Sequence, residues 1–417
     1  MNTPKIRFKG FKDDWEQRKL SELTTMHARI GWQNLRTSEF LDSGDYMLIT
    51  GTDFQEGVID YSTCHYVEKE RYDQDKNIQI KNGSILITKD GTLGKVAYVQ
   101  GLMMPATLNA GVFNVTIKNE NIMDGKYLFQ YLKAPFLMDY VSKKATGGTI
   151  KHLNQSILVD FPVAMPKREE QVKISRYFTA LDNLITLHQR KCDETKQLKK
   201  FMLQKMFPKN GEKNPKIRFE GFTDDWEQRK LSEICERITR KNRNNESDLP
   251  LTIASQFGLI DQRDFFNKVV AAKDMSNYYL LKKGEFAYNK SYSSGFDYGS
   301  IKRLNAYKQG CLSTLYICFG ITSDEVESDY LECFFDTLKW YGDLSMICAE
   351  GARNHGLLNV DTKGFFDEVT VDLPKSLEEQ KRISVYMNAL NRLITLHQRK
   401  CEKLKELKKY MLHNMFV

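Results

Sequence analysis

The chain has 417 residues, enough for two or three domains, and its 41% hydrophobic and 12% aromatic content is ample for packed cores. This composition excludes a disordered chain. The net charge of +8 comes from two segments: residues 169–208 hold eight Lys/Arg against five Asp/Glu, and residues 378–417 hold nine against four. The remainder is neutral, so the basic pI alone is a weak argument for nucleic-acid binding.

The cysteines and the beginning of the chain indicate the compartment. The eight cysteines form no CxxC pair and show no spacing typical of a zinc site. The first residues lack the apolar stretch of a signal peptide, and no apolar run is long enough to span a bilayer. We therefore expect a reduced, cytoplasmic protein that holds no metal.

The first element is a short segment that occurs twice. Residues 4–23, PKIRFKGFKDDWEQRKLSEL, return as residues 215–234, PKIRFEGFTDDWEQRKLSEI, with 17 of 20 positions identical. The aromatic residues Phe8, Phe11 and Trp15 match Phe219, Phe222 and Trp226. Matched aromatics of this kind predict that each segment clamps onto the domain or helix beside it, and packing is the favoured interpretation over function.

Residues 24–168 form a first insert that we expect to be α/β or mostly β. Its candidate strands are residues 46–50, 84–88 and 112–117, with a glycine turn at residues 91–94 and a helix at residues 126–142. A polar loop with two glycines follows at residues 145–154. Basic and hydroxyl side chains in such loops reach phosphates and base edges, although solvation of the surface explains them too. The candidate contacts are Arg29, Lys89, Lys95, Lys143, Lys144, Thr149, Lys151 and His152.

Residues 169–207 form a long helix with one apolar seam. Apolar or small residues recur at steps of three and four, a period near 3.5 that is typical of a helix packed against a partner as a coiled coil. At 1.5 Å per residue the segment spans roughly 58 Å. The seam positions expected to pair are Ile174, Leu181, Ile185 and His188.

Residues 235–377 form a second insert of similar size with little identity to the first. Its candidate strands are residues 251–254, 285–289 and 314–319, followed by a helix at residues 327–348. Two glycine-containing loops, residues 289–300 and 349–359, again carry basic and hydroxyl groups. The candidate contacts here are Arg240, Lys241, Arg243, Lys290, Tyr292, Ser293, Arg353, Asn354 and His355.

Residues 378–416 repeat the long helix without a gap, and its pairing positions are Ile383, Leu390, Ile394 and His397. Only residues 208–214 separate the first helix from the second copy of the short segment. Because a parallel pair would require the chain to return along the whole helix, we predict antiparallel packing. His188 and His397 should then lie close together near a pseudo-twofold axis. A polar layer is the favoured interpretation of this pair, with a metal site or a pH switch as the alternatives.

Sequence motifs of several enzyme classes are missing. The segment GTLGK at residues 91–95 lacks the earlier glycine and the following Ser/Thr of a nucleotide phosphate loop. The Asn/Asp-Pro-Pro-aromatic tetrad of amino-methyltransferases is absent, as are HExxH, GxSxG and a metal-spaced carboxylate cluster. The scattered pairs of Asp and Glu, which lie within the repeated segments, are interpreted as capping or solvated groups and not as an acid and a base.

The whole chain resembles the specificity (S) subunit of type I DNA restriction-modification systems, the HsdS family. The resemblance rests on the order of short segment, insert and long helix, given twice. It also rests on the WEQRKLSE segments, on GSILITKDGTLGKVAY, and on the EEQ-initiated helices ending in LKKFMLQKMF and LKKYMLHNMF. The second insert departs from the family's DGTxGK turn and carries SYSSGFDYGS instead, which leaves open which of its residues read bases.

The resemblance implies an α/β fold with two target recognition domains joined by two long antiparallel coiled-coil helices, in a pseudo-twofold internal repeat. The domains would be residues 1–168 and 209–377, and the spacer helices residues 169–208 and 378–417. Each domain would read one half of an asymmetric bipartite site in double-stranded DNA, with the helices setting the spacer.

The resemblance also implies that this chain has no catalytic residue and is not itself an enzyme, and it implies the partners. Two methylation (M) subunits would dock on the helices and recruit the restriction (R) subunits, with S-adenosylmethionine, ATP and Mg²⁺ bound by those partners and not by this chain. Two other readings stay open: a DNA-modifying enzyme, a nuclease or methyltransferase, with an unrecognised active site, or an adaptor that binds only proteins.

Overall fold

The structure is a computed structural model that describes residues 3–144, 152–254, 258–266, 271–291, 295–348, 353–354 and 357–416. The chain forms two compact units, Met1–Gln189 with Gln398–Val417, and Arg190–His397. These units divide both long helices near their middles, whereas the sequence suggested boundaries at the helix ends. The difference arises because each globular core includes residues from both helices.

The first unit contains two four-stranded sheets. One is antiparallel in the order β2 (Thr24–His27), β11 (Val112–Ile117), β8 (Ile85–Thr88) and β9 (Val96–Tyr98). The other has the order β6 (His65–Tyr66), β3 (Met47–Ile49), β10 (Ala106–Leu108) and β7 (Gln79–Ile80), with β3 and β10 parallel. Strand β8 is buried along its whole length, as its apolar sequence ILIT requires.

Shorter elements complete the first unit. Strands β4 (Phe54–Gln55) and β5 (Val58–Ile59) form a small hairpin. Strand β1 (Glu16–Lys19) pairs with β12 (Pro162–Met165) and so joins the two ends of the insert. The short helices are α1 (Leu20–Leu23), α2 (Lys69–Asp73) and α5 (Gln155–Val159).

The second unit repeats this frame around different strands. An antiparallel sheet has the order β14 (Cys235–Arg237), β21 (Ile317–Ile321), β18 (Phe286–Asn289) and β19 (Ser300–Arg303). Strand β13 (Glu227–Lys230) pairs with β24 (Thr370–Leu373), as β1 does with β12. The other pairs are β15 (Leu251–Ala254) with β16 (Gly258–Asp261), β17 (Tyr279–Lys282) with β20 (Gln309–Leu312), and β22 (Arg353–Asn354) with β23 (Leu357–Leu358).

The short helices of the second unit are α7 (Leu231–Ile234), α8 (Gln262–Phe266) and α11 (Thr362–Glu368). All six predicted strands are present as β3, β8, β11, β15, β18 and β21, within a few residues of the predicted bounds. The predicted mixed α/β architecture with a repeated frame is confirmed.

The prediction of a single helix in each insert is wrong, because each insert forms two helices there. In the first unit α3 (Gly125–Lys133) and α4 (Phe136–Lys144) are separated at Pro135, which has no backbone N–H and holds Ala134 in an extended conformation. In the second unit α9 (Ser328–Asp336) and α10 (Tyr341–Ile347) are separated at Leu338, whose φ of 59° is incompatible with a continuing right-handed helix.

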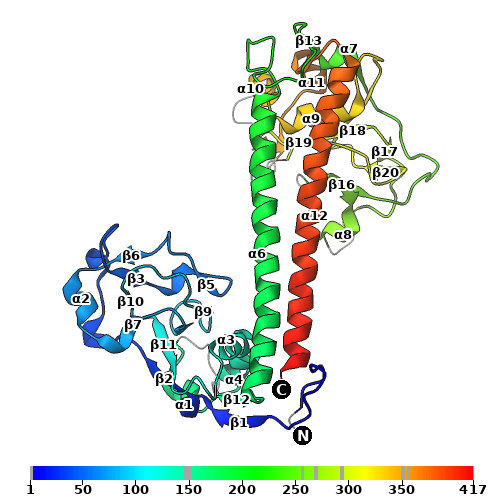
Figure 1. Ribbon diagram of the computed structural model, residues 1–417. Helices are drawn as coiled ribbons and strands as arrows, with labels where there is room; N and C mark the ends of the chain where they lie inside the picture. The colour runs from blue at the N-terminus through cyan, green and yellow to red at the C-terminus, as the bar shows by residue number, and fades with distance from the viewer. Residues whose placement is uncertain are drawn as a thin grey trace. The chain divides into compact units, whose positions relative to one another are not determined.

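The long helices are α6 (Arg168–Lys205) and α12 (Leu377–Met415), drawn in green and orange-red in Figure 1. In the first unit Phe178 of α6 stacks on Phe416, with ring centroids 5.5 Å apart, and Lys408 of α12 pairs with Asp182 at 2.6 Å. The start of α6 therefore lies beside the end of α12. In the second unit the start of α12 shares a core with Met206 and Phe207, which follow the end of α6. Within both units the helices run antiparallel, as predicted.

The predicted seam positions divide into buried and half-buried residues. Ile174, Leu181, Ile383 and Leu390 are buried in the two cores, whereas Ile185 and Ile394 are half-buried. His188 and His397 are also half-buried, and both have interaction partners. Because His188 belongs to the first unit and His397 to the second, their proximity stays a prediction.

Candidate nucleic-acid interface

The duplicated segments hold each insert by matched contacts. Arg7 forms a bidentate ion pair with the buried Glu170, and Arg218 does the same with Glu379, with N–O distances of 2.7–2.9 Å. These bonds raise the pKa of both guanidinium groups. Phe8 and Phe219 pack edge-on against Tyr177 and Tyr386, so the predicted aromatic clamp is confirmed.

A glutamine in the first turns of each long helix joins the helix to its insert. The side-chain oxygen of Gln171 accepts from the Asp124 backbone N–H at 2.8 Å, and its amide donates to the carbonyl oxygens of Ile122 and Pro166. Gln380 makes the corresponding bonds to Glu327, Glu325 and Pro374. Two inserts of different sequence are thus seated in the same way on one repeated frame.

The first insert brings several predicted residues to one loop surface, defined by Lys89, Lys95, Lys143, Lys144 and His152. The backbone of Leu153 donates to the Lys89 carbonyl at 2.8 Å, which places the His152 segment beside the end of β8. The turn after β8 is closed by the Thr88 hydroxyl, which accepts from the Lys95 N–H at 2.9 Å. Lys95, Lys143, Lys144 and His152 are exposed, and Lys89 is half-buried.

Glycine geometry fixes this turn against α4. Gly91 and Gly94 both have φ of +72°, and a Cβ on Gly94 would lie 2.1 Å from the Sδ atom of Met138 in α4. The positive φ favours glycine at both positions, and Gly94 lies against the helix whose C-terminal end carries Lys143 and Lys144. His152 Nδ1 lies 2.5 Å from Asp90 Oδ1 in the same turn. The surface therefore offers four exposed basic side chains around this turn.

Arg29 does not belong to this surface, and its assignment to DNA is corrected. Its side chain is only 1% exposed, and its guanidinium donates to the carbonyl oxygens of Leu108, Gln33 and Arg71 and to the side chains of Gln74 and Thr107. Burial, followed by the neighbouring Arg71 charge, lowers the pKa of Arg29. Arg29 holds the second sheet to its loops.

The second insert repeats the backbone arrangement with other side chains. The Leu358 N–H donates to the Lys290 carbonyl at 3.0 Å, which corresponds to the bond between Leu153 and Lys89. Lys290 is half-buried at the end of β18, and Arg243 is exposed. The two inserts thus present equivalent loops after equivalent strands.

Two further candidates of the second insert are committed to other partners. Arg240 is paired with Glu285 at 2.7 Å, so its charge is largely neutralised. Lys241 donates to the Asn277 carbonyl at 3.0 Å and lies 3.9 Å from the centre of the Tyr279 ring. Both side chains are half-buried and have these partners within the insert, and their contact with DNA stays a prediction.

The remaining candidates lie outside the described part of the chain. Thr149, Lys151, Tyr292, Ser293 and His355 are not among the described residues, and Arg353 and Asn354 are described only by the backbone pairing of β22 with β23. Their roles stay predictions.

Sequence reasoning missed a basic hollow of about 440 Å³ in the first unit. It is walled by α3, by the β4–β5 hairpin and by the halves of α6 and α12 in this unit, and its chemistry comes from Gln130, Lys133, Lys405, Lys408 and Lys409. These residues belong to elements far apart in the sequence, so no local pattern could have grouped them.

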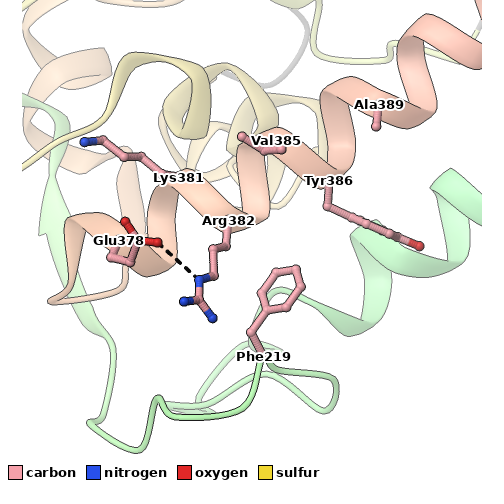
Figure 2. Close-up of a pocket in the computed structure, with 7 residues that line it drawn as sticks. All are labelled: Phe219, Glu378, Lys381, Arg382, Val385, Tyr386 and Ala389. Carbon is pink, nitrogen blue, oxygen red and sulfur yellow. Dashed lines mark hydrogen bonds and ion pairs between the residues drawn. The ribbon is translucent and has the colours of Figure 1, made fainter.

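A second hollow, in the second unit, is mostly apolar. Figure 2 shows Phe219 and Tyr386 on one side of Arg382 and Glu378 on the other, where Arg382 donates to it at 3.2 Å. Val385 at its rim is 69% exposed, and the position corresponds to Arg176 in the first helix. Of its three charged lining residues, Glu378 and Arg382 are paired with each other and Lys381 is the third, and the rest of the lining is apolar or aromatic.

The described residues contain no group of His, Cys, Asp and Glu side chains arranged to hold a metal ion. A search of the same residues for a helix long and apolar enough to cross a membrane also found none.

Known proteins resemble this chain in sequence and in fold. A family model for the type I restriction modification DNA specificity domain matches residues 12–197. The MjaVIII type I restriction enzyme specificity subunit of Methanocaldococcus jannaschii is 25% identical over 232 residues, 53% of either chain. The putative MjaX specificity subunit of the same organism is 26% identical over 215 residues, 50% of this chain and 49% of that one. The chain thus spans about half the length of the curated relatives it matches.

The fold has a solved counterpart. The crystal structure of a type I restriction-modification system S subunit from M. genitalium superposes with a TM-score of 0.64 at 16% identity, covering 100% of this chain and 99% of that one. At this identity the likeness establishes the fold alone, and it does so for both halves of the chain.

Proposed function

We propose that this chain is the specificity subunit of a type I restriction-modification complex, because residues 12–197 match the family model for the type I restriction modification DNA specificity domain. Each insert reads one half of an asymmetric bipartite site in double-stranded DNA. The matching relatives are themselves named as specificity subunits, which supports this assignment.

The observation that carries the proposal is the repeated frame with unlike inserts. The pairs Arg7–Glu170 and Arg218–Glu379, and the glutamines Gln171 and Gln380, make the same contacts in both units. A frame preserved in this detail around two different sheets is expected where one scaffold must present two recognition surfaces. An enzyme with one active site would have no need of that duplication.

The loop surface of the first insert has the chemistry of a DNA contact. Lys95, Lys143 and Lys144 are exposed ammonium groups that pair with phosphates, and His152 offers ring nitrogens for a base edge or a phosphate. Contacts of this type make affinity depend on salt through counterion release. In the second insert the loop beside Lys290 takes the same place.

The long helices act as the spacer and as the docking site for two methylation subunits. Apolar side chains stay exposed on both helices at equivalent positions: Leu184 and Leu393, Leu187 and Leu396, Leu198 and Leu407, and Phe201 and Tyr410. Exposed apolar side chains repeated in this manner are typical of a surface that a partner protein covers.

The catalytic chemistry belongs to the partners. The methylation subunits bind S-adenosylmethionine, and the restriction subunits they recruit use ATP and Mg²⁺. This chain supplies DNA recognition in the cytoplasm and no catalytic group.

The test is footprinting of the chain together with its methylation subunits on DNA. The expected result is a protected site in two parts separated by an unprotected spacer. A complex that assembles yet protects no DNA would instead support a protein-binding adaptor. Turnover by the purified chain alone, given DNA, S-adenosylmethionine and magnesium, would instead support the enzyme.

A further inference from the structure

The basic hollow in the first unit is lined by more lysine side chains than carboxylates. Five lysines line it, Lys126, Lys133, Lys405, Lys408 and Lys409, against two carboxylates, Glu56 and Asp182. Asp182 is already engaged by Lys408 at 2.6 Å and by the Gln130 amide at 2.8 Å. Lys133 donates to the Glu56 carbonyl and is near both carboxylates. Five ammonium groups against two carboxylates still leave an excess of positive charge around the hollow.

Gln130 adds to the lining of the hollow a buried polar atom that lacks a hydrogen-bond partner. Its side chain is 1% exposed, and its Oε1 atom has no hydrogen-bond partner in the described structure. A buried carbonyl oxygen without a donor costs free energy, so it is expected to find a partner. A ligand in the hollow that carries an N–H or O–H group would supply one.

The corresponding place in the second unit is neutralised by acids. Matching the two helices by their buried Tyr127 and Tyr330, Lys133 of α3 corresponds to Asp336 of α9, and Lys126 to Asp329. Asp336 pairs with Lys199 at 2.8 Å and with Lys302 at 2.7 Å.

Lys199 is the counterpart of Lys408 in the repeated helix. Both lysines have an acidic partner, Asp336 for Lys199 and Asp182 for Lys408. The difference lies at the α3 position, where the first unit has Lys133 in place of the acidic Asp336.

We propose that this hollow, which nothing in the proposed DNA-reading role requires, binds a small phosphorylated molecule. The lysine ammonium groups hold its phosphoryl oxygens, and the Gln130 carbonyl accepts a hydrogen bond from a donor elsewhere on the ligand. A volume of about 440 Å³ suits a ligand of nucleotide size. The rings of Tyr98 and Phe129 form the apolar part of the wall.

Its position separates this site from the DNA-facing loop. Tyr98 and Gln100 lie at the end of the β8–β9 hairpin opposite to the turn at Gly91 and Gly94. A ligand here contacts α6 and α12 at once, through Thr179 and Asn183 on one helix and Lys405 and Lys409 on the other.

The environment of Lys133 gives the site a pH dependence. Burial and the Lys408 charge lower the pKa of Lys133 to about 8, against the opposing effects of Asp182 and Glu56. The ammonium form is the one that pairs with a phosphoryl group. Ligand affinity is therefore highest below pH 8 and falls as the pH rises through that value.

The test is titration calorimetry of the full chain with ATP and with pyrophosphate at low salt, using Lys405→Gln and the double variant Lys133→Gln/Lys405→Gln. The matched control is Lys196→Gln, the same position of the repeated helix in the second unit. The site variants should weaken binding of ATP at least tenfold and the control less than twofold. Stronger binding of ATP than of pyrophosphate supports a ligand that also uses Gln130.

Three results would overturn the proposal: no binding of either probe by the unmodified chain, equal weakening by Lys196→Gln, or displacement of bound ATP by duplex DNA. The last would make the hollow part of the DNA contact. The measured quantity is the binding of a small molecule and not of DNA. A failure of the proposed DNA recognition would therefore leave the result of this test unchanged.

Discussion

Arg29 illustrates what burial does to a basic side chain. Its five hydrogen bonds go to backbone carbonyls and neutral side chains, so it acts as a structural cross-link. We predict that Arg29→Met lowers the free energy of unfolding by about 2 kcal/mol, because several buried acceptors lose their donor. Urea unfolding measures this change, and DNA affinity per folded molecule should stay the same.

Lys95→Met is the matched comparison on the exposed loop surface. It should change stability by less than about 0.5 kcal/mol and weaken DNA binding, with a smaller salt dependence. If Arg29→Met instead left stability unchanged and weakened DNA binding, the structural role of Arg29 would be refuted.

Asp336 makes the second unit sensitive to acid. Burial acts to raise its pKa, but the ammonium groups of Lys302 and Lys199 outweigh burial and lower the pKa to about 2, from 3.8. A carboxyl whose pKa is lower in the folded state than in the unfolded state stabilises the fold at pH values above its unfolded-state pKa. This contribution is lost as the pH falls from 3.8 towards 2.

Thermal unfolding of the second unit should therefore show a loss of roughly 2 kcal/mol across that interval. Asp336→Asn should remove this acid-dependent part and be less stable than the unmodified chain at neutral pH. The same pH profile in both proteins would contradict the assignment.

Side-chain identity predicted exposure only in part. Lys95 and Lys143 are exposed, as expected of lysines in loops. Arg29 and Arg240 could not be distinguished from them, because their partners, the Leu108 carbonyl and Glu285, come from distant parts of the chain. The same reason hid the hollow around Gln130.

Among the elements, the ends of the two long helices complete the cores. Phe416 touches the rings of Tyr127, Tyr131 and Phe178, and Phe207 touches Trp226 and Tyr330 in the other unit. We predict that Phe416→Ala destabilises the first unit by about 3 kcal/mol and leaves the second unchanged, while Phe207→Ala does the reverse. Hydrogen exchange resolved by segment measures both effects.

If Phe416→Ala increased exchange equally in both units, the assignment of the C-terminal end of α12 to the first core would be wrong.

The spacer role of the helices has its own prediction. Inserting one heptad into each helix keeps the apolar seam in phase and lengthens each rod by roughly 10 Å. The DNA site bound should then have a longer spacer between unchanged half-sites, or binding should be lost. Methylome sequencing measures the spacer length. A complex that kept the original spacer would contradict the proposed spacer role of the helices.

Strands and long helices were predictable where the residues alone determine them. The short β-branched run ILIT of β8 favours a buried strand, and the three-four spacing of the α6 seam favours a packed helix. The short helices were less predictable from the sequence. Pro135 gave a signal for the break between α3 and α4, but the left-handed Leu338 has no sequence signature.

At the scale of the whole molecule, the repeat separates what is constant from what varies. Exchanging residues 24–168 for the insert of a related protein should change one half of the recognised sequence and leave the other half as it was. Methylome sequencing of cells with the complete system measures the outcome. A change in both halves, or in neither, would contradict independent recognition by the two inserts.

The repeated frame was predictable because its two copies are nearly identical in sequence, whereas the recognised bases are not. They depend on side chains of loops whose conformation is set by distant contacts, such as Met138 against Gly94. The repeated frame can therefore be predicted from the sequence repeat, whereas base specificity depends on the local geometry of the loops.

The division of the chain into Met1–Gln189 with Gln398–Val417 has a consequence for biosynthesis. Leu412, Met415 and Phe416 are buried in the core that the N-terminal insert forms. During translation that core stays incomplete until these residues have emerged from the ribosome, although its own strands were made more than two hundred residues earlier. A nascent chain must therefore keep an apolar surface covered for that interval, which is a natural point for chaperone binding.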